Sequence, residues 1–377
     1  MSEWKNHLLE EVASLVKDQM TPNGLEELAY IGLEHIEEAS LRLSGIGQST
    51  DVTSQKFRFK SNDILFGKLR PYFRKVVKPE FDGICSTDIW VIRAKDGFDQ
   101  NFLYYFFATW DFVNFANSGD SGTRMPRADW NFVKQSDWLF PPVEEQRAIA
   151  EVLSSLDDKI DLLHRQNKTL ESLAQTLFRQ WFIEQARDEW EEGTLADFAY
   201  NIRENIQPKE IETDTKYVGL EHIERKDFAL HSFGSGSDVE SNKSVFRKHD
   251  ILFGKLRPYF HKVCFAPFDG VCSTDILIIR PKSPELFPFC LMAFFQKEVV
   301  DHSDMASEGT RMPRTNWEIL SNYPVGIPDY ESISRFNESV LPMIEKIETN
   351  INQIASIART RDTLLPKLMN GEVTTYA

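Results

Sequence analysis

The eleven residues DILFGKLRPYF occupy positions 63–73 and occur again, unchanged, at positions 250–260. Three further stretches return at the same offset of 187 residues: YIGLEHIE (30–37) as YVGLEHIE, FDGICSTDIWVIR (81–93) as FDGVCSTDILIIR, and GTRMPR (122–127) without change. Between residues 30 and 130 about half of the aligned positions are identical, without a gap. The chain therefore contains two copies of one domain of about 140 residues.

The repeated domain predicts an α+β fold with a mixed sheet. β-branched residues cluster in DILFGKL and in DIWVIR and its copy DILIIR, which is typical of buried strands. The apolar runs FLYYFFATWDFV (102–113) and FCLMAFFQKEVV (289–300) predict helices that pack on the sheet. The segments around these runs, 94–120 and 281–307, share little sequence, so the copies have diverged there.

Each copy is followed by a stretch with helical periodicity. From Glu144 to about residue 185 there is no Gly or Pro, and apolar residues recur every seven positions from Ile149 to Leu177. Such a helix would be roughly 60 Å long. A second apolar stripe runs from Val340 to Leu368, with Pro342 and Pro366 expected near its two ends, where helix breakers cost least.

Neither long helix can bury its apolar stripe alone. The helices either pack on each other as an antiparallel coiled coil or pack separately on their own domains. We favour the coiled coil because so long a helix would extend well beyond a domain of this size. The predicted organisation is a domain at 1–143, a helix at 144–186, a domain at 187–328 and a helix at 329–377, with the two domains separated by the helices and related by an approximate twofold axis.

The bulk composition limits the possible functions. A net charge of −15 argues against a protein that coats nucleic acid non-specifically. The four cysteines lack metal-binding spacing and are predicted to be buried thiols in a reducing compartment. We expect neither a secretory signal nor a membrane span, and hence a cytoplasmic protein. Walker, amino-methyltransferase and nuclease motifs are not found in the sequence, which indicates a recognition protein without catalytic residues, metal or cofactor of its own.

The repeated loops combine positive charge with aromatic residues inside an acidic chain. Residues 63–75 carry a net charge of about +3, whereas residues 144–192 contain 12 acids against 6 bases. This segregation favours contact with a polyanion, and Arg and Lys can bind both phosphates and guanine edges. The alternative is an ordinary exposed hairpin with solvated charges. The candidate DNA-binding residues are Lys68, Arg70, Tyr72, Arg74, Lys75, Thr123, Arg124 and Arg127, with Lys255, Arg257, Tyr259, Lys262, Thr310, Arg311 and Arg314 in the second copy.

Two repeated motifs are ambiguous. In CSTDI, Ser86 and Ser273 and the neighbouring threonines could contact phosphate, but backbone capping at a strand start is the preferred interpretation. In GLEHIE, His35 and His222 stand beside carboxylates without a nucleophile or a metal partner. A hydrogen-bonded structural role is therefore favoured over an acid–base role.

The whole pattern resembles the DNA specificity subunits of type I restriction–modification systems. The resemblance rests on two target-recognition domains carrying DILFGKLRPYF, CSTDI and GTRMPR, on PPVEEQRAIAEVLSSLDDKID followed by LFRQWF, and on LLPKLMNGEV. It implies binding to a bipartite site in double-stranded DNA. It also implies two modification subunits, which carry S-adenosylmethionine and methylate adenine N6, and two restriction subunits that use ATP and Mg²⁺.

Members of that family commonly carry two unlike recognition domains and read asymmetric sites. Here the domains are about half identical, so we hypothesise an interrupted, nearly palindromic site with similar halves. The chain looks like a dimer of half-length subunits fused head to tail. The rival interpretation is a stand-alone DNA-binding regulator or scaffold without a modification partner.

Overall fold

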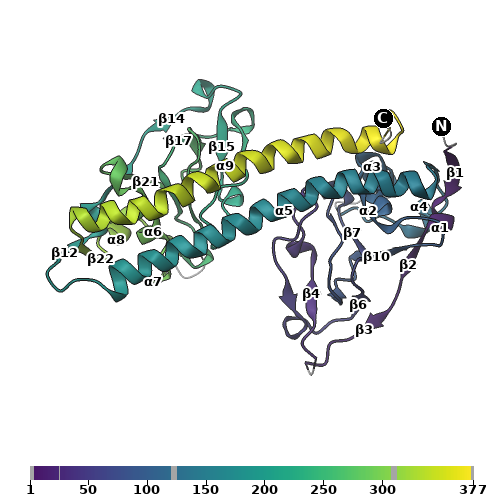
Figure 1. Cartoon of the computed structure of the whole chain (residues 1–377), viewed down its shortest axis with the longest axis horizontal. Helices are drawn as coiled ribbons and strands as arrows, with labels where there is room; N and C mark the ends of the chain where they lie inside the picture. Colours follow the sequence, from purple (N-terminus) through teal and green to yellow (C-terminus); the bar gives the residue numbers. More distant parts are fainter. Residues whose placement is uncertain (1–3, 25, 120–124, 307–311, 375–377) are drawn as a thin grey trace. The chain divides into compact units, whose positions relative to one another are not determined.

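The structure, a computed structural model, describes residues 4–24, 26–119, 125–306 and 312–374. It contains two compact units: unit 1 comprises residues 1–159 and 357–377, and unit 2 comprises residues 160–356. Each unit therefore includes a section of both long helices (Figure 1). The division into four consecutive segments stays a prediction, as does the twofold relation between the domains.

Unit 1 is built on two main sheets. An antiparallel sheet has the strand order β2-β10-β7-β8, with strands Ala13–Val16, Ile89–Ala94, Ile64–Gly67 and Val76–Val77. A mixed sheet has the order β3-β6-β9-β4-β5, with strands Gln19–Met20, Lys56–Phe59, Gly83–Cys85, Ala29–Ile31 and Gly47–Gln48. A third, two-stranded sheet pairs β1 (Lys5–Leu8) with β11 (Asp137–Phe140). Because β4 and β9 are parallel while their other neighbours are antiparallel, the predicted mixed sheet is confirmed.

Unit 2 repeats these sheets strand for strand. The antiparallel sheet is β13-β21-β18-β19, with strands Ala199–Ile202, Ile276–Pro281, Ile251–Gly254 and Val263–Phe265. The mixed sheet is β14-β17-β20-β15-β16, with strands Asn205–Ile206, Lys243–Phe246, Gly270–Cys272, Lys216–Val218 and Gly234–Ser235. A two-stranded sheet pairs β12 (Glu191–Thr194) with β22 (Pro324–Ile327).

A repeated ion pair fixes the register of the central strands. Arg93 on β10 binds Asp63, just before β7, through two hydrogen bonds of 2.7 Å each. Arg280 and Asp250 make the same pair in unit 2, also at 2.7 Å. Both aspartates are buried, so the bidentate arginine supplies the partner that each carboxylate requires. The predicted strands at both copies of DILFG and at DIWVIR and DILIIR are thus confirmed and are held in one register.

Short helices cover the antiparallel sheets. Unit 1 contains α1 (Leu9–Val12), α2 (Gln100–Ala108), α3 (Trp110–Ser118) and α4 (Trp130–Val133). Unit 2 contains α6 (Phe287–Phe295), α7 (Lys297–Met305) and α8 (Trp317–Ser321). The apolar run at 102–113 is two helices, because Thr109 adopts an extended backbone and its hydroxyl caps α3 by accepting the Phe112 N–H. The predicted buried helices are confirmed, since all of α6 and most of α2 are buried.

The long helices are α5 (Val143–Arg179), which ends in a π turn at Gln180–Glu184, and α9 (Tyr330–Met369). The expectation that Pro342 marks a helix end is wrong, because α9 begins twelve residues before it. Pro342 cannot donate an N–H and costs stability inside a helix. Its neighbours Val340 and Ile344 lie in the core of unit 2, and this burial holds the turn in helical form.

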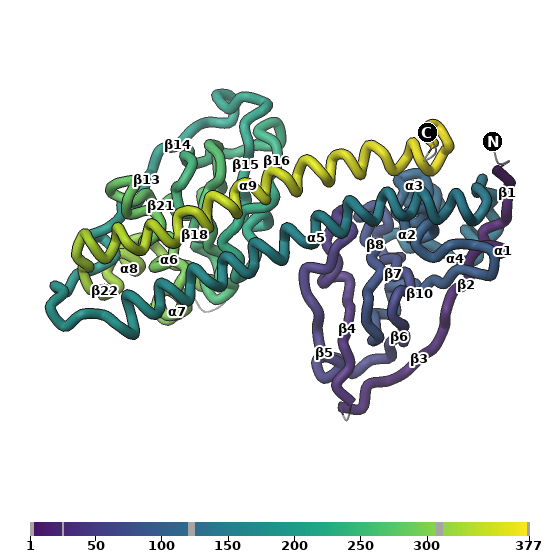
Figure 2. Tube along the Cα trace, viewed as in Figure 1, coloured from purple at the N-terminus to yellow at the C-terminus, as the bar shows by residue number. Residues whose placement is uncertain are grey.

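The two long helices pack on each other in antiparallel fashion. In unit 1, Asp157 of α5 contacts Arg361 of α9. In unit 2, Asn167 contacts Asn350 at 2.8 Å, and Phe178 lies against Phe336. The α9 residue number falls as the α5 number rises, which confirms the antiparallel pair. The helices also enter the domain cores: Ala174 and Phe178 of α5 belong to the core of unit 2, and Leu365 and Leu368 of α9 belong to that of unit 1, so the two packing modes weighed for the helices coexist. Figure 2 shows the end of α9 beside the early segments of unit 1.

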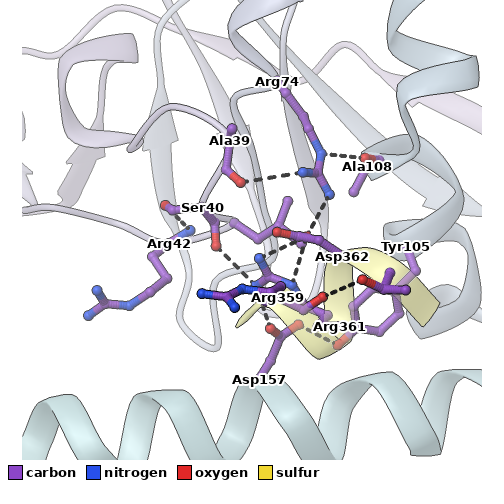
Figure 3. Close-up of polar contacts among 12 residues, drawn as sticks. Ala39, Ser40, Arg42, Arg74, Tyr105, Ala108, Asp157, Arg359, Arg361 and Asp362 are labelled. Carbon is purple, nitrogen blue, oxygen red and sulfur yellow. Dashed lines mark hydrogen bonds and ion pairs between the residues drawn. The ribbon is translucent and has the colours of Figure 1, made fainter. Parts of the chain in front are cut away.

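The contact between α9 and unit 1 is a buried ionic network (Figure 3). Arg361, 3% exposed, donates to Asp157 at 2.7 Å and to the Ser40 carbonyl oxygen at 3.2 Å. The Tyr105 hydroxyl donates to the other Asp157 oxygen at 2.7 Å. Burial opposes the charge of Arg361, but Asp157 and Asp362 outweigh burial and raise the pKa of the guanidinium. Removing one partner from such a buried pair typically costs 3–5 kcal/mol, so this contact is a strong tie between α9 and unit 1.

The contact between α5 and unit 2 includes a buried carboxyl. Glu171 is 1% exposed and lies beside Asp227, which His231 and the Ala229 N–H keep charged. Burial first, and then the Asp227 charge, raise the pKa of Glu171 well above its ordinary value. Glu171 is therefore neutral in the folded protein near pH 7.

Within the described residues, no helix has the length and apolar character needed to cross a membrane.

This raised pKa predicts a pH-dependent stability. An unfolded Glu171 ionises near pH 4.5, so the stability associated with its neutral form is full below that pH and is lost as pH rises toward the folded-state pKa. Replacing Glu171 with Gln should leave stability at pH 5 nearly unchanged and raise it by more than about 1 kcal/mol at pH 8. Urea unfolding at the two pH values measures this, with Glu151→Gln at an exposed α5 position as control. An equal change at both pH values would contradict the assignment.

Candidate nucleic-acid interface

The first repeated loop, which follows β7, has a strained backbone conformation. A 3₁₀ turn, Pro71–Phe73, is flanked by Arg70 and Arg74, whose φ values of +51° and +48° lie in the left-handed region. Such residues cost of order 1–3 kcal/mol each and persist only where the surroundings impose them. In unit 2 the turn Pro258–Phe260 has the same conformation at both flanks. The loop geometry is therefore a repeated property of both units.

The second repeated motif holds the first loop in place. The Arg70 N–H donates to the Pro126 carbonyl at 2.8 Å, and the Ala128 N–H donates to the Lys68 carbonyl at 2.9 Å. In unit 2 the Arg257 N–H donates to Pro313 at 2.8 Å and the Thr315 N–H to Lys255 at 3.0 Å. Loops that are about 55 residues apart in the sequence thus form one surface in each unit.

The CSTD motif completes this surface. The Lys68 N–H donates to the Asp88 carbonyl at 2.9 Å, and the Asp88 carboxylate pairs with Arg127 at 3.3 Å. The copy pairs Asp275 with Arg314 at 2.6 Å. A carboxylate that holds an exposed guanidinium in one orientation reduces the entropy lost when that arginine binds a ligand.

Each surface presents the same three side chains to solvent. Tyr72 is 42% and Tyr259 49% exposed, and Met125, Arg127 and their copies are exposed as well. Lys68 and Arg70 lie half-buried behind them, and the Arg70 guanidinium lies over the Phe73 ring at 6.0 Å, as its copy lies over Phe260. In unit 2, burial lowers the pKa of Lys255 although Asp275 opposes the effect. The surface combines cations with an exposed aromatic ring, which suits contact with phosphates and bases.

Arg74 has a different role from the predicted one. It is 2% exposed, and its guanidinium donates to the Ala108 carbonyl at 2.6 Å and lies 3.6 Å from Asp362. Burial lowers the pKa of Arg74, and Asp362 partly restores it. A buried arginine with these partners cannot reach DNA, so the expectation of a DNA contact is corrected: Arg74 anchors the loop to α2 and α9.

The remaining predicted residues fall into two groups. Lys75 and Lys262 are half-buried and donate to the carbonyl oxygens of Leu33 and Leu220, at 2.8 Å and 2.6 Å. They tie the loop to the GLEH motif, and their DNA contacts stay predictions. Four candidates lie outside the described residues: Thr123, Arg124, Thr310 and Arg311.

A pocket of about 260 Å³ adjoins Lys68 and Arg127 in unit 1, with Trp90 and Trp130 in its wall. Trp130 was not among the residues predicted from the sequence. Its signal was present, since Trp130 and Trp317 recur at the repeat offset just after GTRMPR. In unit 2, Trp317 lines a pocket of about 350 Å³ with Arg203 and other residues.

The structural interpretations of the ambiguous motifs are confirmed. His35 Nδ1 accepts the Gly32 N–H at 3.0 Å, and His222 accepts the Gly219 N–H at 2.8 Å. The Ser86 hydroxyl accepts the Asp88 N–H at 3.2 Å, and its copy in unit 2 does the same. All four cysteines are buried free thiols.

Comparison with known proteins identifies this architecture. Residues 1–172 match the family model described as the type I restriction modification DNA specificity domain. The type I restriction enzyme MjaIX specificity subunit of Methanocaldococcus jannaschii is 29% identical over 314 residues, covering 75% of this chain and 71% of that protein. The HindI specificity subunit of Haemophilus influenzae is 23% identical over 461 aligned positions, covering 99% of this chain and 100% of that protein.

Among solved structures, the S subunit of the type I restriction-modification system from M. genitalium matches with a TM-score of 0.53 and 18% identity, covering 97% of this chain and 96% of that chain. This likeness shows the fold. The chain is similar to DNA specificity subunits of type I restriction–modification systems over most of its length, and its first 172 residues match the model of their DNA specificity domain. The curated relatives are named specificity subunits, which agrees with the predicted recognition role.

The close packing behind the loop predicts a sharp position dependence for glycine substitutions. A Cβ added at Gly67 would lie 2.9 Å from the Leu33 side chain and 3.3 Å from the Lys75 carbonyl oxygen, whereas one at Gly45 meets nothing within 4 Å. Gly67→Ala should therefore destabilise the protein by about 1–3 kcal/mol and Gly45→Ala by much less. Denaturant unfolding of the two variants measures the difference, and equal stabilities would contradict the described packing.

Proposed function

We propose that this chain is a DNA specificity subunit that reads a bipartite DNA site, with the loop surface of unit 1 on one half and that of unit 2 on the other. The observation that carries the proposal is the repetition of one strained loop, with the same backbone contacts and the same exposed Tyr, Met and Arg, in an acidic chain. Strain that is kept in both copies indicates a geometry that binding requires. Two readers in one chain suit two half-sites.

The proposal includes partners that supply the chemistry. The names of the relatives, type I restriction enzyme specificity subunits, support an assembly with modification and restriction subunits. We propose two modification subunits that carry S-adenosylmethionine and methylate adenine, and two restriction subunits that use ATP and Mg²⁺. This chain would bind none of these cofactors, and the partners would share the binding of DNA phosphates, which suits its net charge of −15.

The two half-sites are proposed to be similar and inverted, since both units expose the same groups at equivalent positions. Trp90 lines the pocket beside the unit 1 loop, and Leu277 stands at the equivalent position in unit 2. Such a difference allows the half-sites to diverge at single bases. A stand-alone regulator would bind DNA in the same way. Capture of such a chain from its host, however, would recover no methyltransferase-sized partner.

Methylation mapping tests the function directly. Long-read sequencing of host cells with and without this gene, with the partner genes intact, should show one interrupted motif whose adenine methylation depends on the gene. Similar halves in inverted orientation would support the pairing of equivalent units with equivalent half-sites. A motif with unrelated halves would contradict that part of the proposal, and unchanged methylation would contradict the function itself.

Paired variants test the division of labour between the units. Lys68→Ala with Arg70→Ala should weaken protection of one half-site, and Lys255→Ala with Arg257→Ala should weaken protection of the other. Each lost contact should cost about 1–3 kcal/mol of binding free energy. Hydroxyl-radical footprinting of the assembled complex measures this. The exposed α9 residues Arg359 and Lys367, replaced with Ala, provide a control of equal charge, and equal loss at both half-sites from either pair would refute the assignment.

A further inference from the structure

The long helices occupy equivalent positions in the repeat, since Val143 and Tyr330 begin α5 and α9 and lie 187 residues apart. Two copies of the chain could therefore pair α5 with α5, or α9 with α9, in place of α5 with α9. The repeat offset identifies the residues that would meet in such a pairing. These residues decide whether the chain can recognise its own copy.

The side chains that meet at the docked helix end differ between the two units. In unit 1, the end of α9 places Arg361 against Asp157 and Tyr105. At the equivalent position in unit 2, α5 places Ala174, and the counterparts of Asp157 and Tyr105 are Ile344 and Met292. Ala174 and Met292 are 0% exposed and Ile344 is 1% exposed. At this position, unit 1 thus receives a helix through a buried ionic network, and unit 2 receives one through apolar contacts.

An α5 end would not fit unit 1. Ala174 and Gln175 would stand where Arg361 and Asp362 stand, so Asp157 would lose its cation and Arg74 its nearby carboxylate. Both of these groups are largely buried, and a buried charge without a partner is strongly unfavourable. The bulkier Phe178 would also replace Leu365, which is fully packed in the core of unit 1.

An α9 end would not fit unit 2. Arg361 would replace Ala174 in a core lined by Ile344 and Met292, where neither side chain offers a hydrogen-bond acceptor. The larger side chain would also overfill the space that a methyl group occupies. The cost therefore combines an unpaired buried charge with steric strain.

Two further contacts discriminate in the same direction. The buried amides of Asn167 and Asn350 meet at 2.8 Å, but in a like-with-like pair Asn167 would face Leu163 and Asn350 would face Ile354. Glu171 lies beside Asp227, whose counterpart in unit 1 is Ser40. Single buried polar pairs of this kind are known to fix helix register and partner choice.

We propose that these contacts form a pairing code that makes α5 accept only α9, so that the two halves of the chain recognise each other and reject a second copy of themselves. The code lies outside the DNA-binding surface and does not depend on the proposed function. It would keep the duplicated chain from exchanging halves with its own copies, although the two halves share one fold.

A split form of the whole protein tests the code. The chain is divided between Ala186 and Arg187, after the π turn and before β12, and both halves are produced in one cell so that every residue is present. The first half is supplied with either of two affinity tags. Capture through one tag should recover the second half. It should recover less than about a tenth as much of the first half that carries the other tag. Recovery of both in equal amounts, or of neither, would overturn the proposal.

A transplant variant tests which residues discriminate. The transplant combines Tyr105→Met, Asp157→Ile and Arg361→Ala, which give unit 1 and α9 the residues of unit 2 and α5. Recovery of the first half that carries the other tag should then rise about tenfold. The exposed neighbours supply the matched control, Asp158→Ile with Arg359→Ala, which should leave recovery unchanged. A transplant that recovers the second half but no more of the first would overturn the role of the ionic network. Capture with the unaltered halves decides the pairing code even if the transplant does not fold.

Discussion

The structure of unit 1 depends on a helix end that is distant in the sequence. Unit 1 is closed by residues 357–377, and the tie is the buried network in which Arg361 binds Asp157 and the Ser40 carbonyl. Because the charges are removed from water, they are stable only when every partner is present. Arg74 joins this network near Asp362 and ends the first repeated loop, so the loop is supported by the far end of the chain.

Loop strain and loop support belong together. Left-handed residues at both ends of a 3₁₀ turn are unfavourable in isolation. Here the backbone of the second motif accepts the Arg70 N–H, and Arg74 is anchored by Ala108 and by α9. The exposed tyrosine is therefore presented on a rigid turn, and little conformational entropy remains to be lost when a ligand binds.

The two copies preserve their surfaces and differ at their helix contacts. The loop conformations, the bidentate Asp–Arg pair and the histidine-capped turn are the same in both units. The helix positions, in contrast, exchange an ion network for an apolar core. A binding surface constrains the type and position of each group, whereas a core tolerates coordinated changes if volume is kept and polar groups remain paired.

The sequence alone determined the duplication, the α+β class, the strands around DILFG and the two long helices, because these depend on local periodicity and on exact repetition. Three features were decided only by the tertiary structure. Arg74 is buried although Phe73 and Lys75 on either side of it are only half-buried, α9 continues through Pro342, and unit 1 takes a helix end from a distant segment. The physical reason is common to all three: burial and charge pairing between distant residues outweigh local preferences, and a single sequence does not record which distant residues meet.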